Sequence, residues 1–411
     1  MALEFEKITE DVEEMVRSTR QHQQEREVLL EEFLEKLRTH ATDWERLEYC
    51  LNLVRKKADR KKLRAARPLN ILEPLNVAVD PPPLPPQGTI IASDGSQILP
   101  DHHAPYLYSL INVGVIIYFH SSDKTPVQLT LANLDYPGRE SFSSHPVPVT
   151  QFSDNGALVS LRRDRAEIET LARMVLEYRD QKRPILALLD QRLLYWPVVG
   201  AVDGDGTKEM VLQAWQEAMT AIRESDGLLA GYIVRPRKQS VLTLLRSLEV
   251  EEAGFDIQSL MERDGNFGLN DAMMFARILR PGQRSKVFVD VSQHNDDFRQ
   301  TDLHNEVCFF YLNPGHPDWQ IARVDLPLWV ARDPDVVNSV HALIYDQCQI
   351  LGNYPYVLAR ADEIAVIGRR DQENLNLMIE NAMQRQGITA APTAKQSSKD
   401  IARAGRKRHE I

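Results

Sequence analysis

Five prolines in the six residues Pro81–Pro86 divide this 411-residue sequence into two parts of different character. Proline fixes φ and has no backbone N–H, so such a run favours a stiff, extended connection over a helix or an inner strand. We therefore expect a linker at residues 81–87. It separates an N-terminal part, residues 1–80, from a larger domain at residues 88–385.

The N-terminal part has a helical pattern. Residues 1–66 contain no glycine or proline and are rich in Glu, Gln, Leu and Arg. Leu30, Phe33, Leu34 and Leu37 recur at spacings of three and four, which places them on one face of a helix. No strict heptad is sustained, so we expect a helical arm that packs on the core or on a partner, and not a long coiled coil.

After the linker the pattern changes to strands and helices in alternation, and then to a polar tail at residues 386–411 that we expect to be basic and disordered. Two or three strands with short connections precede the first helix, so the order predicts an α/β protein with a mixed sheet flanked by helices. The expected strands are 89–93, 106–119, 127–131, 185–189, 228–234, 306–312 and 320–326, and the expected helices are 157–180, 208–224 and 335–351.

Bulk properties exclude several classes. The composition, 43% hydrophobic and 26% charged, is typical of a globular protein, and no apolar run is long enough for a membrane helix. Three isolated cysteines and an acidic start without a signal-like core favour the cytoplasm. The net charge of −10 argues against coating nucleic acid, although residues 55–67 carry eight cations and one acid. Such a run fits a local contact with DNA or a solvated helix face.

Two acids carry the chemical prediction. Asp94 follows the apolar run 89–93 and Asp190 follows the fully apolar run 185–189. A crossover helix between them permits the two strands to lie parallel, which would bring both carboxylates to one edge of the sheet. Oxygen ligands of this kind suit Mg²⁺ or Mn²⁺. Taken alone, either acid is equally compatible with a turn or a cap.

Several ordered segments resemble the NurA nuclease family. The similarity covers about residues 85–385. The matching segments are Ser93-Asp94-Gly95-Ser96-Gln97, Tyr108-Ser109-Leu110-Ile111-Asn112-Val113-Gly114, Gly231-Tyr232-Ile233, Gly282-Gln283-Arg284-Ser285, Phe309-Phe310-Tyr311-Leu312, Ile321-Ala322-Arg323-Val324-Asp325-Leu326-Pro327 and Gly352-Asn353-Tyr354-Pro355-Tyr356-Val357-Leu358-Ala359-Arg360-Ala361.

The resemblance implies a ribonuclease H-like core and a Mn²⁺- or Mg²⁺-dependent nuclease that processes DNA ends. It also implies a homodimer that works with a HerA-type hexameric ATPase. Asp94 and Asp190 take the roles of the first and second metal ligands. A further family acid on the preceding helix corresponds to Glu167 or Glu169, and one sequence does not choose between them.

Two departures from the family pattern affect the site. The family has glycine after the second acid, where this chain has Gln191, and a tyrosine followed eight residues later by histidine, where this chain has Tyr354 and Asp362. Aspartate at position 362 still offers an oxygen ligand to the metal. The alternative to a DNA nuclease is therefore a degenerate module that binds DNA or the ATPase without cutting. A third reading is a hydrolase that acts on RNA.

Overall fold

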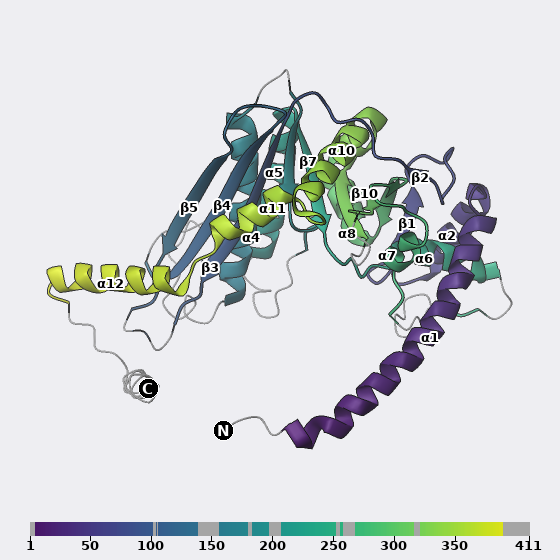
Figure 1. The fold of residues 1–411 in the computed structure, drawn as a ribbon, viewed down its shortest axis with the longest axis horizontal. Coiled ribbons are helices and arrows are strands. Elements are labelled where there is room, and N and C mark those ends of the chain that lie inside the picture. Colours follow the sequence, from purple (N-terminus) through teal and green to yellow (C-terminus); the bar gives the residue numbers. More distant parts are fainter. Residues whose placement is uncertain are drawn as a thin grey trace. The chain divides into compact units, whose positions relative to one another are not determined.

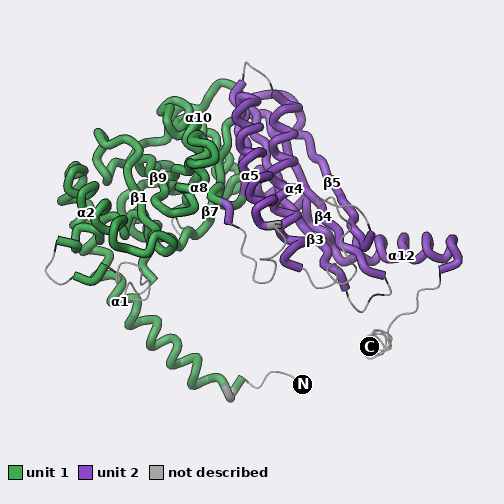
Figure 2. The backbone as a smooth tube through the Cα atoms, turned by 180° about the vertical axis from the view of Figure 1, so that it is seen from behind, with its two compact units in different colours: residues 1–88, 190–194, 228–356 green, residues 89–189, 195–227, 357–411 purple. Residues whose placement is uncertain are grey.

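The structure is a computed structural model that divides into two compact units, shown in green and purple in Figure 2. Unit 1 comprises residues 1–88, 190–194 and 228–356, and unit 2 comprises residues 89–189, 195–227 and 357–411. The structure describes residues 5–101, 104, 106–138, 156–179, 183–196, 207–251, 255–257, 268–315 and 321–388. The predicted tail therefore lies almost entirely outside the described residues.

Unit 1 begins with two helices, α1 (Thr9–Thr39) and α2 (Trp44–Lys57) (Figure 1). The four apolar residues expected on one face of α1 are buried, and they share a core with the buried residues of α2. The helical prediction for residues 1–66 is wrong at its end, because α2 ends at Lys57. Ala65–Pro68 forms strand β1, because the buried Ala65 and Ala66 pair antiparallel with β9 (Phe288–Val291).

The sheet of unit 1 is antiparallel, in the order β1-β9-β10-β11-β7. Strands β10 (Val307–Leu312) and β11 (Ala322–Pro327) are buried at every position. Both were predicted from their apolar runs, and the aromatic residues of β10 are core residues. The remaining elements of unit 1 are β2 (Ala78–Val79), β7 (Gly227–Ile233), α6 (Ser240–Arg246), α7 (Asp271–Ala276), β8 (Arg284–Ser285), α8 (Gln293–Thr301), α9 (Leu328–Ala331) and α10 (Pro334–Leu351).

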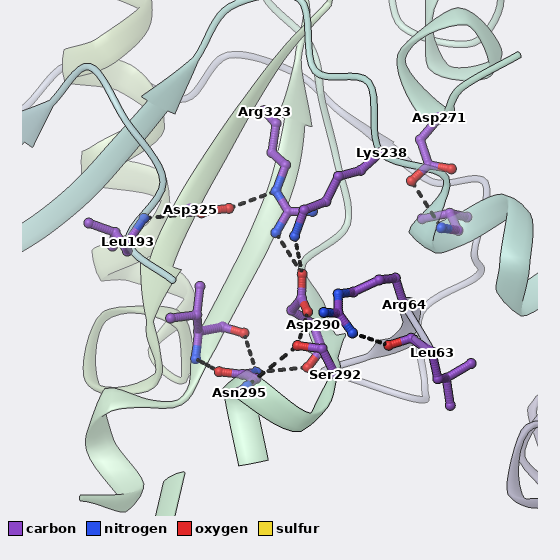
Figure 3. A network of polar contacts seen from close by, with 12 residues as sticks. Leu63, Arg64, Leu193, Lys238, Asp271, Asp290, Ser292, Asn295, Arg323 and Asp325 are labelled. Carbon is purple, nitrogen blue, oxygen red and sulfur yellow. Dashed lines mark hydrogen bonds and ion pairs between the residues drawn. The ribbon is translucent and has the colours of Figure 1, made fainter. Parts of the chain in front are cut away.

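A buried ion network crosses this sheet (Figure 3). The Arg323 guanidinium donates to Asp325 at 2.7 Å and to Asp290 at 3.0 Å, and it stacks 3.7 Å from the centre of the Phe309 ring. Lys238 donates to the same Asp290 carboxylate at 3.1 Å. Since Arg323 is 1% exposed and bound on two sides, it is a structural residue and not a phosphate ligand.

The four strands of unit 2 follow the order β6-β3-β4-β5. Strand β3 pairs in parallel with β6 in the register Ala92↔Leu188, and β4 pairs antiparallel with β5. The parallel pair confirms the crossover predicted through α4. The elements of unit 2 are β3 (Gly88–Ile98), β4 (Ser109–His120), β5 (Val127–Asp135), α4 (Gly156–Glu177), β6 (Ile185–Leu189), α5 (Thr207–Glu224), α11 (Tyr356–Ala365) and α12 (Arg369–Arg385).

Strand β3 differs from the prediction at its end. It continues to Ile98, so Asp94 lies within the strand and not after it. Burial changes at this residue: Thr89 to Ser93 are buried, whereas Asp94 to Gln97 are partly exposed. Asp94 therefore marks the end of the buried half of β3. On α4, Leu161, Ile168, Leu171 and Val175 are buried as expected, but Leu176 is exposed.

None of the helices in the described part of the chain is long and apolar enough to cross a membrane.

Candidate active site

Strand β3 presents alternate residues to two different helices, as side chains of a strand do. On one face, the Ser93 hydroxyl donates to the Glu167 carbonyl of α4 at 3.1 Å, and the Gln97 amide donates to Ser160 of α4 at 3.0 Å. Gly95 lies between them on the same face. These contacts fix α4 along the half of β3 that carries Asp94.

The other face of β3 contacts α11. The Asp94 carboxyl group shares a hydrogen bond with the Asp362 carboxyl group, and two residues along the strand the Ser96 hydroxyl donates to the Ala365 carbonyl. Asn112 of β4 donates to the same carbonyl at 2.8 Å. The end of α11 is thus held by two side chains, three residues after Asp362.

Gly114 of β4 permits this close packing of α11. A Cβ atom at position 114 would lie 2.4 Å from the Ala365 nitrogen and 2.6 Å from the Ala361 oxygen. Only glycine fits at such a distance from another backbone, so Gly114 lets α11 approach the sheet closely enough for Asp362 to reach Asp94.

The two glutamates on α4 have different surroundings. Glu167 is 6% exposed, and its Oε1 atom would lie 2.5 Å from a Cβ atom at Gly95, the residue next to Asp94. Glu169 is half-exposed and pairs with Arg165 at 2.7 Å. Residues two apart on a helix point in different directions, so only Glu167 faces β3.

Arg163 is the cation of this cluster. Its Nε lies 3.2 Å from Glu167 Oε1, and its Nη2 donates to Asp164 at 2.8 Å. Burial alone would lower the pKa of Arg163, but the hydrogen bond with Asp164 and the charges of Glu167 and Asp94 raise it. Arg163 was missed from the sequence, although its spacing of four from Glu167 is a signal that finds such pairs.

The environment of Asp94 disfavours its charged form. Burial raises the pKa of Asp94, and the Asp362 carboxyl group raises it further. The Gly95 N–H, which donates to Asp94 Oδ1 at 2.8 Å, and the Arg163 charge act in the opposite direction. Two carboxyl groups in contact repel one another when both are ionised, and a proton or a cation relieves that repulsion.

Asp190, Gln191 and Tyr354 belong to unit 1. Burial raises the pKa of Tyr232, with a smaller contribution from the Asp190 charge, and Tyr354 packs edge-on against the Tyr232 ring at 5.7 Å. Asp190 directly follows β6, two residues beyond Leu188, just as Asp94 lies two residues beyond the paired Ala92.

The replacement of the family glycine by Gln191 introduces no backbone strain, because Gln191 is not among the residues with positive φ. The glycine that permits two backbone segments to approach closely is instead Gly231 of β7, which faces the Gln191 carbonyl. A Cβ atom at position 231 would lie 2.3 Å from the Gln191 carbonyl oxygen. The glycine needed in this turn is therefore on the neighbouring strand.

The carboxylate oxygens of unit 2 are the kind of donor atom that a hard divalent cation prefers. Asp94 and Asp362 supply carboxylate oxygens in contact, and Glu167 lies beside Gly95. In the described residues, no group of three or more His, Cys, Asp or Glu side chains already has the arrangement of a metal site. A cation bound here would therefore draw together side chains that now pair with Arg163 and with each other.

The mixed strand pairing and the carboxylate cluster define an α/β protein with an acidic, oxygen-donor site. The NurA domain model matches residues 88–367, which is more than half of the chain. The chain therefore belongs to the NurA nuclease family. The mixed sheet flanked by helices predicted from the sequence is confirmed.

The solved structures that resemble this chain share little sequence identity with it. The NurA nuclease from Sulfolobus solfataricus is 12% identical, with a TM-score of 0.47, over 83% of this chain and 94% of that one. A NurA bound to dAMP and manganese is 13% identical, with a TM-score of 0.37, over 92% of this chain and 98% of that one. The catalytic domain of human Endonuclease V is 12% identical, with a TM-score of 0.31, over 71% and 84%. No protein with a curated description matches this chain.

Proposed function

We propose that this protein is a divalent-metal-dependent nuclease that cleaves DNA at or near strand ends. The observation that carries the proposal is the contact between the Asp94 and Asp362 carboxyl groups, with the Glu167 carboxylate beside Gly95. Carboxylates gathered around a strand within a nuclease-family domain are typical ligands of Mg²⁺ and Mn²⁺. A NurA structure containing manganese supports the same choice of metal.

In this proposal Asp94 and Asp362 hold the metal, with Glu167 as a further ligand from the same unit. The role of Asp190 as second metal ligand stays a prediction from the sequence. When bound, the cation would polarise a phosphodiester and activate a water molecule. Arg163 balances the carboxylate charge in the metal-free protein. Tyr354, packed on Tyr232, borders the part of unit 1 that carries Asp190.

The test is cleavage of end-labelled single- and double-stranded DNA with Mn²⁺ or Mg²⁺. We expect Asp94→Asn, Asp362→Asn and Glu167→Gln each to reduce the rate at least about a hundredfold, the range for loss of a charged group that acts in the transition state. Glu169→Gln is the matched control, because Glu169 lies two residues from Glu167 but pairs with Arg165. Equal cleavage by wild type and Asp94→Asn would exclude the proposal.

The alternative function is binding to DNA or to an ATPase without cleavage. It is favoured by the two departures from the family pattern, Gln191 in place of glycine and Asp362 in place of histidine. Calorimetric titration with Mn²⁺ separates the two functions. Binding that is lost in Asp94→Asn supports the nuclease, whereas no detectable binding together with retained DNA affinity supports the alternative. Adding labelled RNA to the cleavage assay tests whether RNA is the preferred substrate.

We propose further that the protein forms a homodimer that acts with a HerA-type hexameric ATPase, as its family membership implies. Size-exclusion chromatography with light scattering tests the dimer. Co-expression with such an ATPase tests the partnership, and elution of the two proteins in separate peaks would exclude it.

A further inference from the structure

A cluster of cations lies outside the residues that match the NurA domain. The basic turn, residues 55–62, comprises the end of α2 and the residues that follow it before β1, and it belongs to unit 1. It contains six cations and a single acid, Asp59. The turn was the most strongly charged stretch noted in the sequence, and the candidate active site leaves it without a role.

The backbone of the basic turn is firmly held. Val54, Ala58 and Leu63 are buried in the core of unit 1 before, within and after it. The Asp59 carbonyl accepts from the N–H groups of Lys62 and Leu63, each at 3.0 Å. The Asp59 carboxylate accepts from the Lys61 N–H at 3.0 Å. The single acid is therefore used to shape the turn, and the basic side chains are presented from a fixed backbone.

Two of the six cations are neutralised within the protein. The guanidinium groups of Arg55 and Arg60 lie 3.7 Å and 3.2 Å from the Asp296 carboxylate of α8. The other four, Lys56, Lys57, Lys61 and Lys62, are exposed. Within the part of the chain that the structure describes, no acidic side chain pairs with any of these four ammonium groups.

Favourable interaction with the α2 dipole explains only part of this pattern. Lys56 and Lys57 lie in the last turn of α2, where cations stabilise a helix. Lys61 and Lys62 lie beyond the end of the helix, where that effect has fallen away. Four unpaired lysines on an anchored turn in a protein of net charge −10 make a local positive surface that folding does not require.

We infer that the basic turn binds the phosphate backbone of DNA, as a contact separate from the candidate active site. The inference rests on the proposed function for its choice of polyanion. Lysine offers a compact charge on a flexible stem, which suits phosphates and reads no base sequence. The turn therefore contributes affinity without sequence preference, and it lets an acidic protein hold DNA.

The experiment measures DNA affinity without divalent metal, so that cleavage plays no part. Fluorescence anisotropy of a labelled 30-mer duplex gives the dissociation constant of the full-length protein between 50 and 200 mM salt. Replacing all four lysines with glutamine should weaken binding by about tenfold or more at 0.1 M salt. It should also reduce the slope of log affinity against log salt by about 2 to 4, since each phosphate contact contributes about 0.9.

Two control variants separate a local contact from overall charge. Replacing the same four lysines with arginine keeps the charge and should preserve affinity and slope. Replacing Lys124, Arg369, Arg370 and Arg385 with glutamine removes four exposed cations of unit 2 and should change both much less. The inference would be overturned by an unchanged salt slope when the four lysines are replaced with glutamine. An equal loss of DNA affinity in the unit 2 variant would also overturn it. A protein that binds DNA through this turn but does not cut it refutes only the proposed nuclease activity.

Discussion

The Asp94 and Asp362 carboxyl groups, 268 residues apart in the chain, share a hydrogen bond across the contact between β3 and α11. The family pattern has histidine at the position of Asp362. Aspartate there keeps a ligand for a hard cation but places two like charges together. This contact determines how the metal-free protein responds to mutation and to pH.

Asp362→Asn should stabilise the metal-free protein at pH 7. The pKa of Asp94 is raised by burial and by Asp362, and an acid with a raised pKa contributes stability when protonated that is lost as the pH rises through that pKa. Removing the Asp362 charge should raise the free energy of unfolding at pH 7 by up to about 1 kcal/mol, because the repulsion between the two carboxylates is lost; this is the range for partly exposed charges. Urea unfolding in EDTA measures it, and the gain should vanish below the ordinary pKa of aspartate. A loss of stability at both pH values would contradict this account.

Gly114→Ala and Gly95→Ala should have different effects. A Cβ atom at 114 meets the backbone of α11, which cannot move without displacing Asp362, so we expect a loss of about 1–3 kcal/mol in the free energy of unfolding. A Cβ atom at 95 would lie 2.5 Å from Glu167 Oε1 and 2.7 Å from Arg163 Cγ, which are side-chain and not backbone atoms. Gly95→Ala should therefore lose Mn²⁺ affinity, with a smaller loss of stability than Gly114→Ala. Calorimetry and urea unfolding on both variants give the comparison.

Asn112→Ala should lower the free energy of unfolding by about 0.5–1.5 kcal/mol, the net contribution of one hydrogen bond, because the Ala365 carbonyl keeps only the Ser96 hydroxyl as a donor. The exposed Asn133 of the paired strand β5 provides the control, and Asn133→Ala should stay within about 0.5 kcal/mol of wild type. Thermal and urea unfolding measure both. Similar values for the two variants would show that Asn112 does not hold α11.

Arg323→Met should destabilise the protein by about 3–5 kcal/mol, since removing one partner of a buried ion network leaves uncompensated charge on Asp290 and Asp325. The Asp325 carboxylate also accepts from the Leu193 N–H at 3.2 Å, in the segment that follows Asp190 (Figure 3). Hydrogen exchange at residues 190–194 should therefore accelerate in this variant. Unchanged exchange there would exclude a role for the network in holding that segment.

Acid should destabilise unit 1 through His341. This histidine is fully buried, its Nε2 donates to the Gly282 carbonyl at 2.8 Å, and burial lowers its pKa to about 4. A base with a lowered pKa contributes stability above its ordinary pKa that is lost as the pH falls toward the folded value. Between pH 6.5 and 4 the loss is about 3 kcal/mol. Urea unfolding of wild type and His341→Gln across this range isolates it, and parallel pH profiles would refute it.

Much of the fold could be predicted from the sequence because burial leaves a local pattern. Helix α4 and strands β6, β10 and β11 follow from the spacing of their apolar residues, and a crossover helix made the parallel pairing of β3 and β6 predictable. Where the local pattern conflicted with pairing, the prediction was wrong. Ala65 and Ala66 lie at the end of the stretch predicted as helical but belong to β1, beside β9.

The sequence by itself determined that Asp94 ends the buried part of an apolar strand, and the ordered motifs around it identified the family. Only the tertiary structure decided that Glu167 and not Glu169 faces that strand, that Asp362 contacts Asp94, and that Arg163 joins them. The reason is physical. Periodicity records whether a residue is buried, whereas the partner of a buried or site residue depends on which distant element packs there, and here Gly95 and Gly114 admit α4 and α11.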